Sequence, residues 1–175
     1  GDLIVNDIVF ERFSEKKLFI YYSHEHPDHF SIPFLKQIKS ENRKDITIIF
    51  QKTQDGRVKS FLKKEGFSVL ELRNRERLEF SKDFFITIGQ VPFYDSWALI
   101  EVDGKKILNT NDCILETPDR VKDIKRITDT VDILFTQFSY ANWVEGGIED
   151  SSRRASLANE KLERIRIQSD NLKPS

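Results

Sequence analysis

The run of five consecutive apolar residues at positions 18–22 is the feature that most restricts the fold of this chain. Lys16 and Lys17 precede the run and Ser23 follows it, so its length fits a strand. A strand that is apolar at every position is buried on both faces, which is typical of sheets that are covered by helices. We therefore expect a layered α/β domain built around this strand.

The rest of the sequence alternates short apolar strands with amphipathic helices. In the first half, the apolar spacing predicts strands at 3–10, 46–50 and 68–72, and helices at 32–38 and 57–65, the second capped by Gly66. In the second half it predicts strands at 77–80, 84–89, 97–102 and 106–109, a hairpin at 102–105, a buried strand at 133–136 and a helix at 153–171. The pattern is that of a mixed α/β domain with several hairpins.

Composition narrows the functional class. The chain has 175 residues, enough for about one domain, and 38% of them are hydrophobic. Its 28 basic and 29 acidic residues give a net charge of −1, which argues against a nucleic-acid coat protein. No apolar stretch approaches the roughly 20 residues that span a bilayer, and the single cysteine, Cys113, excludes a disulfide framework. We expect a soluble, cytoplasmic protein that acts on a small molecule, without a nucleic-acid or membrane partner.

All three histidines of the chain fall within six residues, directly after the predicted strand. They are His24, His26 and His29, and Asp28 lies between the last two. Imidazole nitrogen and carboxylate oxygen are ligands that suit zinc, iron or manganese. At a strand end, residues i and i+2 point to the same side, so His24 and His26 can hold one ion. The turn begun by Pro27 presents Asp28 and His29 to a second ion, as a two-metal centre requires. The alternative is a group of surface histidines in a polar loop.

These residues carry a resemblance to a known family. Residues 24–29, His-Glu-His-Pro-Asp-His, match the His-x-His-x-Asp-His signature of the metallo-β-lactamase fold superfamily. Residues 109–113, Asn-Thr-Asn-Asp-Cys, resemble the segment that carries its metal-bridging aspartate. Together with residues 137–141, these segments resemble the branch of the UlaG-like lactonases and the lyase-like domain of CMP-N-acetylneuraminate hydroxylases. The resemblance extends loosely over residues 2–175.

The resemblance implies a fold and a set of ligands. The fold would be a four-layer αβ/βα sandwich, formed by residues 1–175 as a single partial domain that is incomplete at both ends. His24 and His26 would bind one divalent ion, Asp28 and His29 would bind the other, and Asp112 would bridge the two. Asp28 would also act in catalysis as a proton acceptor. The implied enzyme is a metal-dependent hydrolase in which a metal-bound hydroxide attacks an ester, lactone or phosphoester.

The sequence also departs from the family pattern. The superfamily normally supplies one further histidine to each ion, and no histidine remains here for either position. Asp95 stands where the first is expected, and an oxygen ligand there would favour harder ions; an ordinary loop aspartate is the alternative. The final histidine would lie beyond Ser175. We therefore expect the chain to be part of a longer protein.

Two other functions remain open at this stage. The first is an iron-dependent, sugar-nucleotide hydroxylase-like domain of the CMP-sialic acid type, which requires an electron-transfer partner with a Rieske cluster. The chain has no Cys-x-His pair for such a cluster, so the partner would be another segment or another protein. The second is a degenerate, non-catalytic binding module that keeps part of the metal site. The sequence does not define the substrate or the oligomeric state.

Overall fold

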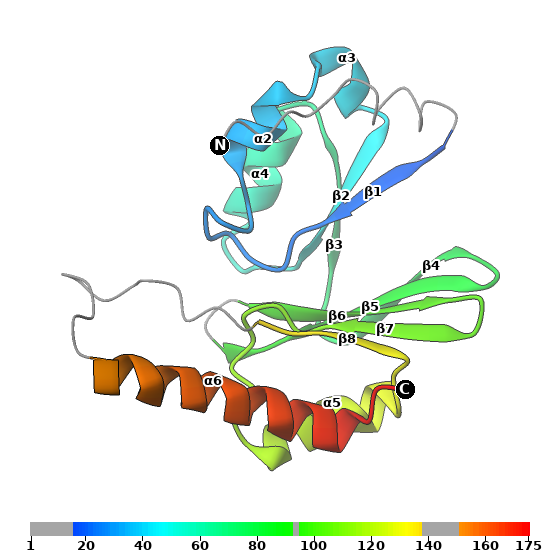
Figure 1. Ribbon diagram of the computed structural model, residues 1–175. Coiled ribbons are helices and arrows are strands. Elements are labelled where there is room, and N and C mark those ends of the chain that lie inside the picture. The colour runs from blue at the N-terminus through cyan, green and yellow to red at the C-terminus, as the bar shows by residue number, and fades with distance from the viewer. Residues whose placement is uncertain (1–15, 93–94, 138–150) are drawn as a thin grey trace. The chain divides into compact units, whose positions relative to one another are not determined.

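The structure is a computed structural model that describes residues 16–92, 95–137 and 151–175 (Figure 1). It divides the chain into two compact units, one up to Glu76 and one from Arg77, each with its own sheet. The elements follow in the order β1 (Leu18–Tyr21), α2 (Ile32–Gln37), α3 (Ser40–Arg43), β2 (Ile46–Gln51), α4 (Arg57–Lys64), β3 (Ser68–Leu72), β4 (Glu76–Ser81), β5 (Phe84–Gln90), β6 (Ser96–Val102), β7 (Lys105–Asn109), α5 (Pro118–Thr128), β8 (Ile133–Phe135) and α6 (Ser151–Leu172). The prediction of one domain over residues 1–175 stays a prediction.

The first unit is a parallel sheet in the order β1-β2-β3 with helices packed against it. Ile48 and Phe50 of the central strand β2 are buried in one core cluster with Leu35 of α2 and with Val58 and Leu62 of α4. Both helices therefore pack on the same face of the sheet. Because all three strands run the same way, their carboxyl ends meet at one edge. The segment that follows β1, which carries the histidines, lies at this edge.

The helices of the first unit begin and end where the sequence provides caps. Ser31 caps α2 by accepting a hydrogen bond from the backbone N–H of Phe34 at 3.3 Å, and a proline occupies its first turn. After α4, Gly66 donates to the Lys63 carbonyl and Phe67 to the Leu62 carbonyl, which closes the last turn. The predicted cap at Gly66 is confirmed.

The second unit is a mixed sheet in the order β4-β5-β6-β7-β8, antiparallel from β5 to β7 and parallel between β7 and β8. Helices α5 and α6 pack on one face of this sheet, where Leu99 and Leu108 are buried with Val121 of α5 and Leu172 of α6. The hairpin at residues 102–105 is confirmed. Both of its central residues have positive φ, and the second is Gly104, which adopts φ 75° without strain.

Several expectations differ from the structure or fall outside it. The strand at 18–22 is wrong as a strand buried on both faces, because all four residues of β1 are half-buried; among the described residues β1 has one neighbouring strand. The strand at 133–136 is wrong as a buried strand, because Ile133 is 46% and Phe135 is 56% exposed. In the described part of the chain β8 has one neighbouring strand, and only its central residue turns toward the helices. Helix α5 was not predicted, although Thr117 caps it through the Arg120 N–H. The predicted strand at 3–10 lies outside the described residues. None of the described helices is long and apolar enough to cross a membrane.

Candidate metal centre

The three histidines occupy a short loop that leaves the end of β1 and turns back toward the core. His24 is buried, His29 is half-buried and His26 is exposed. The His26 carbonyl accepts hydrogen bonds from the backbone N–H groups of His29 at 2.9 Å and Phe30 at 2.7 Å. This turn, begun by Pro27, folds the second half of the motif back over the first. All three imidazoles therefore come together within one loop.

The imidazole rings gather around His24. His24 Nε2 hydrogen-bonds His26 Nδ1 at 2.8 Å, with ring centroids 4.5 Å apart and an interplanar angle of 81°. The His29 ring also lies beside His24, with centroids 4.4 Å apart, and one nitrogen of each ring lies within 4.8 Å of the other. Nitrogens that converge in this way form a donor set for a metal ion.

Two polar residues next to the motif hold the buried histidine in place. Ser23 Oγ hydrogen-bonds His24 Nδ1 at 2.9 Å, and the Gln51 side chain donates from Nε2 to the Ser23 carbonyl at 2.9 Å. All three residues are buried. Because the Nδ1 atom of His24 is engaged, its Nε2 atom is the one that faces the other rings. Support of a ligand ring through its second nitrogen is typical of metal sites. Neither Ser23 nor Gln51 was predicted from the sequence as a residue of the site.

Two buried aromatic residues flank the histidine loop and pack against each other. Tyr22 precedes the motif and Phe30 follows it, and their rings pack edge to face with centroids 5.0 Å apart. Both are buried. Burial also raises the pKa of the Tyr22 phenol to about 12. The two ends of the histidine loop are thus joined through the core of the first unit.

Asp28 lies apart from this buried cluster. Its side chain is 72% exposed, and its Oδ2 atom lies 3.7 Å from His29 Nε2. The carboxylate therefore stands beside the histidine with which it was predicted to share an ion, on the solvent side of the loop. Its roles as a ligand and as a catalytic proton acceptor stay predictions.

Asp112, in the second unit, lies in a tight turn that follows β7. The turn closes through a hydrogen bond from the Cys113 N–H to the Thr110 carbonyl at 3.0 Å. Asn111 has φ 44° and is held by its own N–H, which donates to Asn109 Oδ1, and by its side chain, which donates to the Ser96 carbonyl at 3.0 Å. The turn that presents Asp112 is therefore built from hydrogen bonds at both of its ends.

Asp95 lies beside this same turn. It is buried, and its Oδ1 atom accepts the Ser96 N–H at 2.6 Å. Burial raises the pKa of the Cys113 thiol far above its usual range, and the charges of Asp95 and Asp112 add to this effect. Two of the three aspartates predicted as ligands, Asp95 and Asp112, thus lie near Cys113 in the second unit.

A buried glutamine supports the turn from the helix layer. Gln168 of α6 is 1% exposed, and its Oε1 atom accepts hydrogen bonds from Thr136 Oγ1 at 2.7 Å and Thr110 Oγ1 at 3.3 Å. The same Thr110 hydroxyl lies 3.1 Å from the Phe135 carbonyl oxygen, so the two acceptors share its one proton. These contacts tie the last turns of α6 to the ends of β7 and β8. The predicted helix contained Gln168, but its amphipathic pattern did not mark this residue as buried.

Comparisons with known proteins now define the fold. No family model matches the chain. Among solved structures, the metallo-β-lactamase fold protein YhfI from Bacillus subtilis matches 97% of this chain and 78% of its own, with a TM-score of 0.56 and 14% identity. The chain has the metallo-β-lactamase fold. CmlA, a diiron β-hydroxylase from Streptomyces venezuelae, matches 91% of the chain and 35% of its own, with a TM-score of 0.64 and 17% identity.

A third solved structure is also similar to this chain. Zn²⁺-bound PqqB from Methylobacterium extorquens matches 85% of the chain and 49% of its own, with a TM-score of 0.54 and 16% identity. The metallo-β-lactamase fold predicted from the His-x-His-x-Asp-His signature is confirmed. Proteins of this fold include one described as diiron and one described as zinc-bound.

Curated relatives match over a shorter segment. Cytidine monophosphate-N-acetylneuraminic acid hydroxylase from Xenopus laevis is 37% identical over 99 residues, which are 54% of this chain and 17% of that protein. The protein of the same name from Sus scrofa is 33% identical over 108 residues, 59% of this chain and 24% of that protein. The chain thus covers less than a quarter of the length of these relatives. The predicted resemblance to this branch is confirmed as a partial match.

Proposed function

We propose that this chain is the metal-binding domain of an iron-dependent hydroxylase, related to the CMP-N-acetylneuraminic acid hydroxylases. The observation that carries the proposal is the 33–37% identity to four curated proteins of that name. The histidine cluster supports it, because the nitrogens of His24 and His26 converge to within a hydrogen bond of each other. This hydroxylation is the alternative that the narrower sequence resemblance left open.

The donor set of the motif fits a first-row metal ion. Imidazole nitrogens suit iron as well as zinc, and carboxylate oxygens shift the preference toward harder ions. His24 and His26 would hold one ion, Asp28 and His29 a second, and Asp112 would bridge them. Asp95 is the candidate for the position of a missing histidine. The assignment of His24 and His26 as ligands of one ion is supported by the contact between their rings. Asp95 and Asp112 are assigned from the sequence.

The residues of the chain would perform separate tasks around such a centre. A bound iron would supply the redox chemistry of hydroxylation. Ser23 holds the His24 ring in one orientation, and the buried pair Tyr22 and Phe30 closes the core side of the loop to water. Asp28, on the exposed side, would accept or return a proton. Hydroxylation also needs electrons, so the proposal includes an electron-transfer partner and a sugar-nucleotide substrate.

The second candidate function is the metal-dependent hydrolysis predicted from the sequence. Its support is the same signature, since an imidazole-rich site suits zinc, which would act on water as a Lewis acid. Both candidates use the same histidines. They differ in the ion that is bound, in the need for a reductant and in the substrate bond that is broken.

Metal content distinguishes the two candidates. The untagged protein and the His24→Ala/His26→Ala double variant are purified in parallel, analysed by mass spectrometry and titrated with Fe²⁺ without oxygen and with Zn²⁺. We expect about one to two equivalents of iron in the wild-type protein, fewer in the double variant, and binding of CMP-N-acetylneuraminic acid by the loaded protein. Zinc as the bound ion, with hydrolysis of a lactone or phosphodiester, would support the second candidate. A wild-type protein that binds neither ion would contradict both and favour a degenerate binding module.

A further inference from the structure

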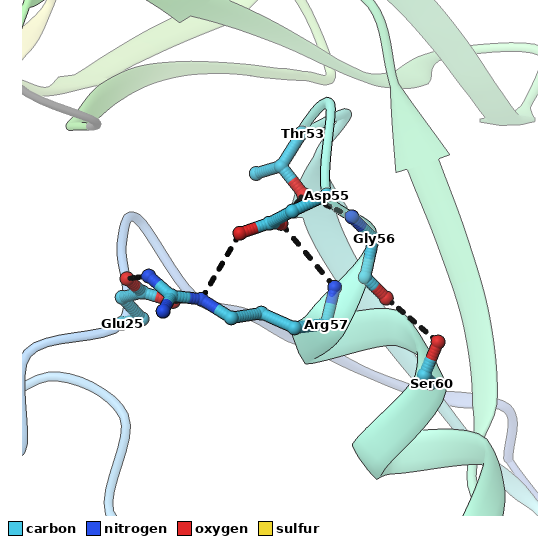
Figure 2. A network of polar contacts seen from close by, with 6 residues as sticks. All are labelled: Glu25, Thr53, Asp55, Gly56, Arg57 and Ser60. Atoms are coloured by element: carbon cyan, nitrogen blue, oxygen red, sulfur yellow. Dashed lines mark hydrogen bonds and ion pairs between the residues drawn. The ribbon is translucent and has the colours of Figure 1, made fainter.

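Glu25, the residue between the first two histidines of the motif, is held by an arginine from a different element. Arg57 donates from Nε to Glu25 Oε2 at 3.1 Å and from Nη2 to Glu25 Oε1. Both carboxylate oxygens are thus bound by one guanidinium, as Figure 2 shows. Two-pronged contacts of this kind fix the direction of both side chains, which a single hydrogen bond does not.

Contacts at the beginning of α4 hold Arg57 in place. The Asp55 carboxylate accepts the Arg57 backbone N–H at 3.3 Å and lies 3.1 Å from its Nε atom. Thr53 Oγ1 donates to the same carboxylate at 3.1 Å and accepts the Gly56 N–H (Figure 2). The Arg57 N–H is also the largest cause of a lowered pKa for the Asp55 carboxyl. The guanidinium is therefore directed toward Glu25, although the Arg57 side chain is 66% exposed.

The topology of the sheet explains why these two residues meet. Strand β1 leads into the histidine loop, and β2 leads through residues 52–56 into α4, which begins at Arg57. The two strands are parallel neighbours, so both connections leave the same edge of the sheet. A side chain on the first turn of α4 can therefore reach the loop that carries the ligands.

We propose that Arg57 is a positioning residue for the metal site, which acts by clamping Glu25 and thereby fixing the backbone between His24 and His26. This inference rests on the proposed metal-binding function. The clamp is exposed, and exposed ion pairs add little to the stability of a fold. Its effect is therefore expected in the geometry of the two flanking ligands and much less in the free energy of unfolding.

The test measures metal affinity and stability together. Wild type, Arg57→Ala, Glu25→Gln and the double variant are titrated with Zn²⁺ in the presence of a competing chelator, and with Co²⁺ for its visible spectrum. We expect each single variant to bind about three- to tenfold more weakly, at or below the low end of the range for outer-shell partners because the pair is exposed. The double variant should bind no more weakly than either single one, because both changes remove the same clamp.

Two further variants separate positioning from a general effect. Arg57→Lys keeps the positive charge but cannot bind both oxygens of Glu25 as a guanidinium does. The metal affinity of this variant should therefore lie between those of wild type and Arg57→Ala. Lys63→Ala removes the same charge from the exposed last turn of α4 and should leave the affinity unchanged. The thermal midpoints of all variants should stay within about two degrees of wild type. The ratio of wild-type to Arg57→Ala affinity should also approach one in about 1 M salt.

The outcomes distinguish this inference from the function on which it rests. Equal affinities of wild type, Arg57→Ala and Glu25→Gln, with metal bound in each, would overturn the clamp and leave the metal site intact. Additive losses in the double variant would also overturn it, since the two residues would then act separately. A wild type that binds neither Zn²⁺ nor Co²⁺ would overturn the proposed function, and the clamp with it.

Discussion

The Nε2 atom of His24 and the Nδ1 atom of His26 lie 2.8 Å apart, with their rings nearly perpendicular. A hydrogen bond between two ring nitrogens needs one donor and one acceptor, so a single proton lies between them. A metal ion bound there would take the place of that proton, which makes this pair the centre of the candidate site.

Replacing either histidine should remove metal binding and leave the fold in place. His26 is exposed and belongs to a loop, so His26→Ala opens no cavity in the core. His24 is buried, and His24→Ala should therefore cost some stability through the loss of its Ser23 hydrogen bond. We expect both variants to lose at least one equivalent of bound metal, measured by mass spectrometry, with the circular dichroism spectrum of the wild type.

The exposed residue Gln37 of α2 provides a control in the same unit, since Gln37→Ala should change neither metal content nor stability. If His26→Ala instead unfolds the protein while the metal content per folded molecule is unchanged, the histidines are structural. That result would remove the basis of the proposed centre.

Gln168 should contribute to stability through the two hydroxyls that it binds. Gln168→Leu removes the acceptor of Thr136, and one of the two acceptors of Thr110, from a fully buried position. Loss of a buried partner typically costs about 1–3 kcal/mol, so we expect an unfolding free energy lower by that amount in urea. Thr136→Val removes one of the donors without changing its shape. The double variant should then lose less than the sum of the single losses, and strict additivity would contradict the contact.

Much of the fold follows from hydrophobic spacing alone. The strand after Lys17, the helix capped by Gly66 and the hairpin at Gly104 all depend on local rules, namely apolar runs, C-caps and turn residues. Helix α5 was missed even though Thr117 and Pro118 form an N-terminal cap signal there. The exposure of β8 was not predictable, because its three apolar residues do not reveal how many strands or helices will lie beside them.

The residues of the candidate site were also predicted only in part. The three histidines were identified because the ligands occur together in the sequence, and the structure brings their rings into contact. Their supporting residues were missed, because Gln51 and Arg57 approach the motif only through the parallel pairing of β1 and β2. Asp112 was found from its strand-end motif. Its contribution to a shared site stays a prediction, because it belongs to the other unit.

Asp132 should add a small pH-dependent contribution to the stability of the second unit through its contacts with Lys105 and Lys106. Its carboxylate accepts hydrogen bonds from Lys105 Nζ and from the Lys106 N–H, each at 2.8 Å, and the Lys105 contact is the largest cause of its lowered pKa. A pKa lowered by folding stabilises the protein above the ordinary pKa of aspartate, and this stability is lost as the pH falls through the folded value.

Asp132→Asn should therefore lower the urea midpoint near neutral pH, and the difference from wild type should shrink as the pH falls from about 5 to about 3. Asp123 offers a matched control, since it pairs with Arg126 within one turn of α5 and both side chains are exposed. Asp123→Asn should give little change at any pH. A constant difference between wild type and Asp132→Asn over this range would contradict the ion-pair origin of the effect.

Gly89 should be intolerant of any side chain, because the Trp97 ring lies against its Cα atom. The two residues are directly paired on β5 and β6, and a Cβ at position 89 would lie inside the atoms of the ring. Trp97 is buried in the core of the second unit, so its ring has no free space to move into. We expect Gly89→Ala to lower the unfolding free energy by about 1–3 kcal/mol, the usual cost of overpacking a core.

A second substitution tests whether the ring is the cause. Trp97→Phe alone should destabilise the protein, because it leaves a cavity in the core. In the Gly89→Ala/Trp97→Phe double variant, the smaller ring leaves room for the new methyl group, so the combined loss should be smaller than the sum of the two single losses. Urea unfolding followed by circular dichroism measures all three variants. Additive losses would contradict the close approach of the Trp97 ring as the cause.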